Sequence, residues 1–236
     1  MTNDVKSCLP FRVWRIDTDQ VPDSSDLAVV DSAERDRWHR CVRESDRNGF
    51  LKTRAALRRV LGRIISAEPH TVRFVENTWG KPVLANKTVP PISFSVSHTD
   101  GISIIAVSDG RRIGVDVEQE RCVAERNRIA SQVFGVSIAR ALCSLQDGVQ
   151  DGAFLRLWTA AEAYVKANGT GFAGHEARIP LSLSGSSGLV RLECSGSSAR
   201  ERSLSLFRLS LPRGFAGSLV IEGRQENQEA IVPELM

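Results

Sequence analysis

Hydrophobic and polar positions alternate at the start of the chain and again in its middle. Residues 11–18 (FRVWRIDT) follow a period of two, and so do three runs between Ile92 and Glu118, namely ISFSVSH, ISIIAVS and IGVDVE. This period puts successive side chains on opposite faces of a β-strand. The sequences TDG and DGRR between the three runs are strong turn signals. The pattern therefore predicts a first strand at 11–18 and an antiparallel meander over 92–118.

Between these strands the period changes to that of an α-helix. Asp31 or Ser32 can cap a helix running toward Arg43, and Asp46 can cap a longer one. In the longer helix apolar residues recur at helical spacing while arginines fall mainly on other faces. The apolar set is Phe50, Leu57, Val60, Leu61, Ile64 and Ile65, and the arginines are Arg54, Arg58, Arg59 and Arg63. The pattern predicts an amphipathic helix with a basic flank.

The second half of the chain repeats the order strand, helices, strands. Helical patterns are followed by a Ser/Gly-rich stretch and by strand-like runs; the helices are expected at 125–134, 136–146 and 151–168, the Ser/Gly stretch at 182–188, and the strands at 189–194, 203–211 and 217–222. No residue-level repeat links the halves. The repeated order predicts an α+β fold of two similar lobes packed on each other, each with helices on a small antiparallel sheet. The last dozen residues are polar and are expected to fray.

Composition places the chain among ordinary globular proteins, with 42% apolar and 25% charged residues. No apolar run approaches the ~20 residues of a membrane span, and the first residues (MTNDVKSCLP) lack the order of a secretory signal. A cytoplasmic protein without membrane contact is therefore expected. The cysteines are odd in number and form no CxxC pair, so neither a disulfide framework nor a zinc site is indicated; they are Cys8, Cys41, Cys122, Cys143 and Cys194.

The net charge of +3 is unevenly distributed. Between Glu34 and Arg63, nine arginines and one lysine stand against two glutamates and two aspartates, which gives +6 and leaves −3 elsewhere. Such a segment fits an anionic partner, whether nucleic acid, a phosphorylated small molecule or an acidic protein surface, and it equally fits a solvated helix face. Lysine is scarce, with five among 31 basic residues. A lysine inside a motif is therefore less easily explained as filler.

Two carboxylates share one face of the strand expected at 113–118. Asp116 and Glu118 lie two residues apart, so the pleat points both the same way while Val115 and Val117 point to the other face. Like charges this close repel, and a divalent cation or a bound proton relieves the repulsion, as does solvent or a salt bridge. Oxygen ligands on one wall suit Mg²⁺, which takes further ligands from water and substrate phosphates. The pair is thus an ion site or an ordinary solvated or salt-bridged pair.

Two further pairs carry candidate chemistry. Glu162 and Lys166 stand at i and i+4 on the last expected helix and share a face, which fits a structural ion pair or a site for a metal and the phosphate it neutralises. Ser97 and His98 end a strand just before a glycine turn, where side chains reach an exposed rim. His98 alone equally fits an incidental turn residue.

Four motifs in series resemble the 4'-phosphopantetheinyl transferases of the surfactin-synthetase-activating (Sfp) type. The resemblance covers roughly residues 10–185, and the basic helix is similar to the family's N-terminal helical region. It implies two lobes related by a pseudo-twofold, at 1–112 and 113–236, with coenzyme A in the cleft between them. The motifs are WGKPVL (79–84), FSVSHTDG (94–101), IGVDVE (113–118) and WTAAEAYVKANGTGF (158–172), and the helix carries FLKTRAALRR (50–59).

The resemblance implies a reaction and the residues that perform it. The family transfers the phosphopantetheine arm of coenzyme A to a serine of an acyl or peptidyl carrier protein, uses Mg²⁺ and releases 3',5'-ADP. Asp116, Glu118 and Glu162 match the metal-binding acids, and Glu162 is also implied as the general base. Lys166 matches a lysine that contacts the pyrophosphate and the leaving group.

The same resemblance implies the binding residues. Ser97 and His98 match a phosphate-contacting pair, and Lys81 with Pro82 matches the element beside the adenosine 3'-phosphate. Arg54 belongs to the basic segment that is expected to serve the nucleotide phosphates and an acidic carrier protein, chiefly by raising the encounter rate. We expect a monomer.

Two positions depart from the family's pattern. Ala161 stands where a lysine usually precedes the glutamate, and Gly49 where an arginine is common, although Arg47 or Arg54 can substitute for the latter. If Ala161 faces the same cleft as the neighbours of Glu162, the site is short of one positive charge near the phosphates. These losses keep open the alternative of a catalytically impaired relative that binds coenzyme A or a carrier protein.

A basic protein that binds nucleic acid is the weaker alternative. No helix-turn-helix, zinc or RNP-like aromatic motif accompanies the positive charge. We therefore expect no nucleic-acid partner. Which carrier protein is modified does not follow from the sequence.

Overall fold

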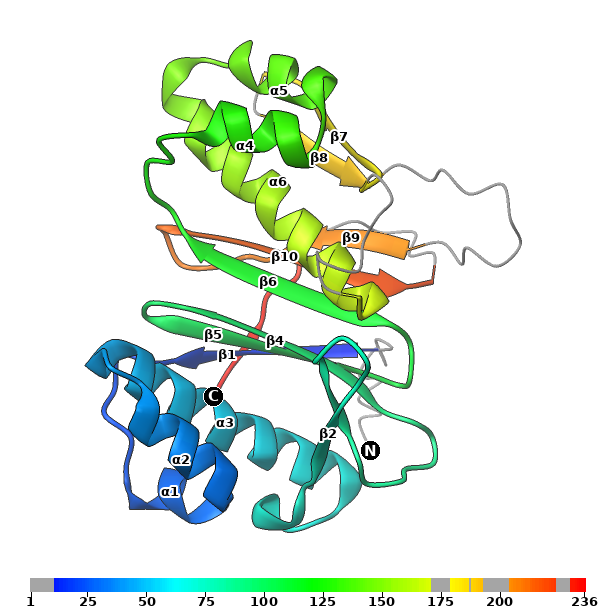
Figure 1. Ribbon diagram of the computed structural model, residues 1–236. Coiled ribbons are helices and arrows are strands. Elements are labelled where there is room, and N and C mark those ends of the chain that lie inside the picture. Colours follow the sequence, from blue (N-terminus) through cyan, green and yellow to red (C-terminus); the bar gives the residue numbers. More distant parts are fainter. Residues whose placement is uncertain (1–10, 171–178, 187, 193–203, 224–229) are drawn as a thin grey trace, which may run out of the picture.

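The computed structural model describes residues 11–170, 179–186, 188–192, 204–223 and 230–236. It has mixed α+β content, as expected, and its main elements form four layers (Figure 1). Two sheets stack face to face in the middle, helices from the first half of the chain cover one outer face, and a long helix from the second half covers the other. A pseudo-twofold relation between the halves stays a prediction.

The first sheet has the strand order β11-β1-β5-β4. β1 (Phe11–Asp17) and β4 (Ser93–Thr99) each pair antiparallel with β5 (Ile102–Ser108), which confirms the first strand and the first hairpin of the expected meander. β11 (Glu234–Leu235) comes from the end of the chain and pairs parallel with β1. The expectation that the last dozen residues fray is therefore wrong at 234–235, where main-chain pairing with β1 holds Glu234 and Leu235 in place.

The second sheet has the order β6-β10-β9, all antiparallel. It consists of β6 (Ile113–Gln119), β9 (Leu204–Arg208) and β10 (Phe215–Glu222). The expected three-stranded meander is therefore wrong at its third strand, because β6 leaves the hairpin and pairs with β10. Instead of a backbone ladder to β4, β6 receives two serine hydroxyls; those of Ser95 and Ser97 accept hydrogen bonds from the amides of Val115 and Val117 at 3.1 and 3.3 Å.

Helices α2 (Ser32–Arg40) and α3 (Glu44–Ile65) confirm the two helices expected in the first half. Asp31 caps α2 as predicted, while α3 begins at Glu44, two residues before the expected cap. The apolar stripe of α3 packs on the first sheet through residues such as Leu57 and Leu61.

A short helix, α1 (Ser24–Val29), precedes them and was not predicted. It is held by a capping box between Asp23 and Asp26, in which each side chain accepts a hydrogen bond from the other residue's backbone. Six residues are too few for a helical period to be recognised in the sequence.

Three helices in the second half confirm the expected series, namely α4 (Arg126–Val133), α5 (Val136–Cys143) and α6 (Asp147–Asn168). The last ends at Gly169, a C-cap in the left-handed region with φ 74°, as predicted. α6 lies directly against β6 because Gly114 has no side chain. A Cβ at that position would stand 1.9 Å from the Ala163 carbonyl oxygen. This close approach packs the C-terminal part of α6, around Ala163 and Ala167, on the beginning of β6.

Two small hairpins complete the described fold. β2 (Phe74–Glu76) pairs with β3 (Pro82–Leu84), and β7 (Leu181–Ser184) pairs with β8 (Leu189–Leu192). β7 occupies part of the stretch expected as a Ser/Gly linker. Parts of the expected elements lie outside the described residues, at 171–172, 187, 193–194, 203 and 225–229.

Two expectations from composition concern membrane-spanning helices and cysteines, and the described part of the chain can be compared with both. None of its helices combines the length and the hydropathy that crossing a bilayer requires. Cys41, Cys122 and Cys143 are free thiols, and the other two cysteines lie outside the described residues.

Candidate functional site

Asp116, Lys166 and Ser97 meet where β6, α6 and β4 come together. Lys166 Nζ lies 2.7 Å from Asp116 Oδ1 and donates to Ser97 Oγ at 3.1 Å, and Ser97 Oγ donates to the same Asp116 oxygen at 2.7 Å. Since Ser97 also accepts from the amide of Val117 at 3.3 Å, its one donor and two acceptor positions are all used. The hydroxyl thus joins both sheets to the helix.

Asp116 is buried and has one free oxygen. Its side chain is 6% exposed, and the buried Oδ2 has no hydrogen-bond partner among the residues that the structure describes. Burial raises the pKa of this carboxyl, and the positive charge of Lys166 only partly offsets that effect. A buried carboxylate oxygen without a partner is costly, so a cation bound there would relieve the cost.

Glu118 and Glu162 are half-buried neighbours of this aspartate. Burial raises the pKa of Glu118, and repulsion from Asp116 raises it further, against the attraction of Arg121. The pKa of Glu162 is also raised, first by burial and then by repulsion from the two other carboxylates, while Lys166 lowers it. The three predicted metal-binding acids therefore share one electrostatic environment.

The donor chemistry of this environment fits Mg²⁺. Within the residues that the structure describes, no three His, Cys, Asp or Glu side chains lie close enough to form a ready cage. Mg²⁺ does not need one, because it typically takes one or two carboxylates and completes its shell with water and substrate phosphates. The free Oδ2 of Asp116, beside two carboxyls with raised pKa, meets that requirement. The assignment of all three acids to the metal stays a prediction.

Lys81 lies near this site but holds the end of α6. Its ammonium group donates to the carbonyl oxygens of Lys166 at 2.7 Å and Ile113 at 3.2 Å. Burial, and to a smaller extent the positive charge of Lys166, lower its pKa to about 8. A pocket of about 230 Å³ opens beside it; Lys81, Pro82, Phe94, Lys166 and Gly169 are among its lining residues. The expected contact of Lys81 and Pro82 with the adenosine 3'-phosphate stays a prediction.

His98 stands at the exposed end of β4, next to a second, polar pocket of about 330 Å³. The surrounding protein lowers the pKa of its imidazole by desolvation, and the positive charges of Lys166 and Arg37 lower it further. The histidine is thus favoured in its neutral form. Gly49 also lines this pocket, and an added Cβ would meet only Thr18, at 3.8 Å.

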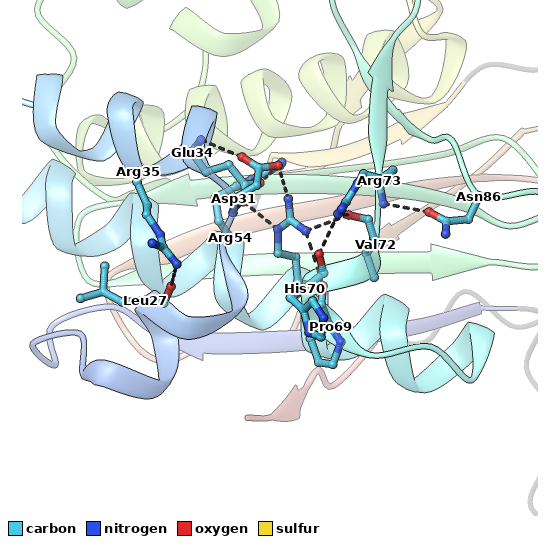
Figure 2. A network of polar contacts seen from close by, with 11 residues as sticks. Leu27, Asp31, Glu34, Arg35, Arg54, Pro69, His70, Val72, Arg73 and Asn86 are labelled. Atoms are coloured by element: carbon cyan, nitrogen blue, oxygen red, sulfur yellow. Dashed lines mark hydrogen bonds and ion pairs between the residues drawn. The ribbon is translucent and has the colours of Figure 1, made fainter.

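Arg54 is engaged with its own fold. Its guanidinium pairs with Glu34 Oε1, with Nη2 at 2.5 Å, and stacks over the ring of Phe74 at 4.5 Å. Glu34 also accepts from the fully buried Arg58, whose Nη2 lies 2.5 Å from Asp31 Oδ2. Figure 2 shows Asp31, Glu34 and Arg54 in this network, together with the Val72 carbonyl that Arg58 reaches at 2.8 Å. The binding role of Arg54 stays a prediction.

The structure divides the basic segment into two groups. Four cations of α3 pair with acids of α1, of α2 and of the N-cap of α2 and so stabilise the helical layer, whereas Arg63 of α3 and several cations of α2 and of the turn after it are exposed. The paired residues are Lys52, Arg54, Arg58 and Arg59, and the exposed ones include Arg37, Arg40 and Arg43, of which Arg43 makes an exposed pair with Asp100 at 3.4 Å.

The expectation for Ala161 is wrong. Its side chain is fully buried in the apolar cluster of α4, α5 and α6, alongside Leu157 and Val165, and it does not face the site of Glu162 and Lys166. Adjacent positions of a helix point about 100° apart, and this rotation carries Ala161 into the core. The missing lysine therefore leaves no gap among the charges that surround Asp116.

Sequence reasoning missed Asn77, which joins the GKP turn to the end of α6. Its Nδ2 donates to the carbonyl oxygen of Gly169 at 3.0 Å. The signal was an asparagine a few residues before Gly-Lys, since such side chains commonly bond the backbone of a following turn.

Two family models match adjacent parts of the chain. Residues 112–212 match the model of the 4'-phosphopantetheinyl transferase superfamily, and residues 14–110 match the model of the N-terminal part of 4'-phosphopantetheinyl transferases. The two matches meet between β5 and β6.

Several curated proteins are similar to this chain. The 4'-phosphopantetheinyl transferase HetI of Nostoc sp. is 35% identical over 165 residues, which cover 68% of this chain and 69% of HetI. A putative 4'-phosphopantetheinyl transferase of Synechocystis sp., slr0495, is 31% identical over 69% of this chain and 66% of its own length. The 4'-phosphopantetheinyl transferase Sfp of Bacillus subtilis is 25% identical over 61% of this chain and 62% of its own length. The motifs, the family matches and these relatives agree, and the chain belongs to the 4'-phosphopantetheinyl transferase superfamily.

Proposed function

We propose that this protein transfers the 4'-phosphopantetheine arm of coenzyme A to a serine of an apo carrier protein and releases 3',5'-ADP. One observation carries the proposal within the family: Lys166, Asp116 and Ser97 form a polar junction in which one buried carboxylate oxygen has no partner in the described part of the chain. A charged junction of this kind suits a reaction on a pyrophosphate, where negative charge must be neutralised.

The metal-binding residues in this proposal are Asp116, Glu118 and Glu162. Mg²⁺ held there supplies positive charge that offsets the charge of the pyrophosphate as the leaving group departs. Lys166 adds a second positive charge from α6, and Ser97 keeps its ammonium group and Asp116 in place.

Glu162 is the proposed general base. Its raised pKa brings the carboxyl closer to neutral pH, where a base is most effective. It takes the proton of the carrier serine as the hydroxyl oxygen attacks the β-phosphorus. The new phosphorus–oxygen bond forms on the carrier, and the bond to 3',5'-ADP breaks.

Coenzyme A is proposed to bind along the rim from the GKP turn to the end of β4. The pocket beside Lys81 and Pro82 is mostly apolar and opens next to Lys166, which suits the adenosine part of the molecule. The hydrogen-bonding positions of Ser97 are all used within the protein. We therefore propose that His98 and the cations around it contact the phosphates of coenzyme A. Arg54 is proposed to lie farther from coenzyme A, where its guanidinium pairs with Glu34.

The carrier protein is proposed to approach the exposed cations of α2. Arg37, Arg40 and Arg43 are exposed, and Arg37 is close enough to act on the pKa of His98. Val42 stands among them and is 96% exposed. A basic surface with an apolar side chain suits an acidic partner, because the charges steer the encounter and the apolar contact adds affinity. We infer further that the protein acts as a monomer in the cytoplasm and on no nucleic acid.

The test is to incubate the protein with Mg²⁺, coenzyme A and a panel of apo acyl and peptidyl carrier proteins. Intact mass spectrometry then reports whether a carrier gains one phosphopantetheine arm. A gain on at least one carrier supports the proposal. Binding of coenzyme A without any gain across the panel would favour the impaired relative.

A further inference from the structure

The hairpin of β2 and β3 is fastened to the end of α6 by two side chains, and Asn77 is the one that also shapes the turn. Asn77 Oδ1 accepts from the amides of Trp79 and Lys81, both at 2.9 Å, and so shapes the turn that carries Gly-Lys-Pro. Its Nδ2 donates to the carbonyl oxygen of Gly169 at 3.0 Å, 92 residues away in the chain. The same amide thus holds the turn with one end and the helix with the other.

Helix ends need such partners. The last carbonyl groups of an α-helix have no partner within the helix, and donors or positive charges near them are stabilising. Lys81 Nζ donates to the Lys166 carbonyl at 2.7 Å, one turn before the contact of Asn77. The two residues of the hairpin therefore cap α6 together. Asn77 can approach this closely because residue 169 is a glycine. A Cβ at that position would lie only 3.3 Å from Asn77 Nδ2 and would crowd it.

This cap borders the pocket that opens next to the charged junction. One wall of the pocket comes from Trp79, Gly80 and Lys81 of the hairpin turn, and another comes from Lys166 and Gly169 of α6. The distance between these walls depends on the hairpin's attachment to the helix. Lys166, whose carbonyl the hairpin holds, reaches Asp116 with its ammonium group.

We propose that Asn77 is a positioning residue for coenzyme A, because it fixes the hairpin to α6 and so sets the pocket and Lys166 relative to the substrate. The proposal rests on the proposed function for the identity of the ligand. Asn77 acts here through Gly169 and the turn, and it takes no part in the chemistry.

Asn77→Asp tests this proposal with little change of shape. The variant keeps the oxygen that shapes the turn, but it loses the donor to Gly169 and places a negative charge at the negative end of the helix. Asn77→Ser is a second variant, which keeps an acceptor for the turn and is too short to reach Gly169. The matched control is Asn86→Ala, because Asn86 closes the base of the same hairpin by accepting from the amide of Arg73 at 2.8 Å (Figure 2) and does not touch α6.

The first readout is the dissociation constant of coenzyme A from calorimetry. Both Asn77 variants lose the hydrogen bond that joins the two walls of the pocket, and this loss is expected to weaken the binding of coenzyme A by about 10-fold. Asn86→Ala keeps that bond and is expected to weaken binding by less than about 2-fold. In transfer assays, kcat/KM for coenzyme A is expected to fall likewise while the KM for the carrier protein stays unchanged. A residue that only stabilises the fold would lower the melting temperature and affect both substrates alike.

The second readout is hydrogen exchange of the peptide that contains Ala167–Gly169. It is expected to be faster in both Asn77 variants than in Asn86→Ala. Faster exchange with unchanged affinity for coenzyme A would make Asn77 a helix cap only and overturn the proposal, as would unchanged exchange with unchanged affinity. If the wild type binds coenzyme A but transfers nothing, the proposed reaction fails, while the loss of binding in the Asn77 variants still supports the positioning role.

Discussion

Asp116 has one carboxylate oxygen held by Lys166 and Ser97, and its other oxygen finds no hydrogen-bond partner within the ranges that the structure describes. Its raised pKa means that the folded protein binds a proton here more readily than the unfolded chain does. The free energy of unfolding therefore falls as the pH rises above about 3.8, the ordinary value, until the carboxyl in the folded protein is ionised. The raised pKa values of Glu118 and Glu162 likewise make the free energy of unfolding fall as the pH rises.

Asp116→Asn is expected to remove part of this pH dependence. In buffer with EDTA, the melting temperature of the wild type should fall relative to that of the variant as the pH rises above about 4, the ordinary pKa of an aspartate, because the amide carries no charge. Mg²⁺ should raise the melting temperature of the wild type at pH 7 and leave that of the variant nearly unchanged, since a ligand stabilises the state that binds it. Parallel melting curves of both proteins across this range, with no effect of Mg²⁺, would contradict the assignment.

Ala161 offers a second test at this scale. Ala161→Lys is expected to lower the free energy of unfolding by several kcal/mol, on the order of the cost of burying a polar group without a partner, because the site is fully buried and apolar. Urea unfolding measures this. The control is Gly148→Lys, near the start of the same helix, where nothing lies within 4 Å of an added Cβ. It should be neutral or slightly stabilising. Tighter coenzyme A binding in folded Ala161→Lys would restore the original expectation.

The sequence predicted these residues unevenly. The pleat of β6 correctly put Val115 and Val117 on one face, in the core between the sheets, and Asp116 on the other. Helical spacing put Glu162 and Lys166 on one face, but it could not show that Lys166 pairs with Asp116 instead. That pairing depends on the approach of α6 to Gly114, which only the packed structure reveals.

At the scale of elements, α3 is joined to α2 by buried charge. Arg58 is fully buried between Asp31 and Glu34, and Glu34 is itself buried and shared with Arg54. Helical periodicity predicted the buried part of the stripe of α3 correctly at Leu57, Val60 and Leu61, but it was wrong at Ile64, which is exposed. It could not separate arginines that pair with α2 from arginines that face solvent, because a period gives the face of a residue and not its partner.

Arg58→Ala is expected to cost about 3–5 kcal/mol of unfolding free energy, the usual result of removing one member of a buried ion pair. The measurement is urea unfolding, and the control is Arg63→Ala on the same helix, where the arginine is exposed and the change should stay within about 0.5 kcal/mol. Equal small losses in both variants would show that the network contributes nothing to stability.

The hairpin of β4 and β5 and the separate strand β6 show what turn sequences cannot predict. The turn sequences were correctly identified, and each does reverse the chain. A turn does not determine whether the next strand joins the same sheet. Here β6 crosses to the second sheet, and the hydroxyls of Ser95 and Ser97 bridge the gap that a backbone ladder would otherwise fill.

At the scale of the whole molecule, the exposed cations of α2 lie on one side of the site, while the paired cations of α3 serve the fold. We expect charge reversal at Arg40 to slow carrier modification and to weaken its dependence on salt, because exposed charges act by screened attraction at long range. Arg63→Glu is the control, since it makes the same charge change on an exposed part of α3. The measurement is kcat/KM for the carrier at low and high ionic strength. Equal effects of Arg40→Glu and Arg63→Glu would assign the effect to net charge rather than to a docking surface.

The central claim is that the junction of β6, α6 and β4 transfers the phosphopantetheine arm. The most direct measurement follows the mass of an apo carrier protein over time with coenzyme A and Mg²⁺, using the wild type and Asp116→Asn side by side. The wild type is predicted to convert the carrier to the form that bears the arm on its serine, with release of 3',5'-ADP. Asp116→Asn, folded and still binding coenzyme A, is predicted to convert it at least about 100-fold more slowly, as is usual when a group that stabilises transition-state charge is lost. Equal rates for the two proteins would contradict the account.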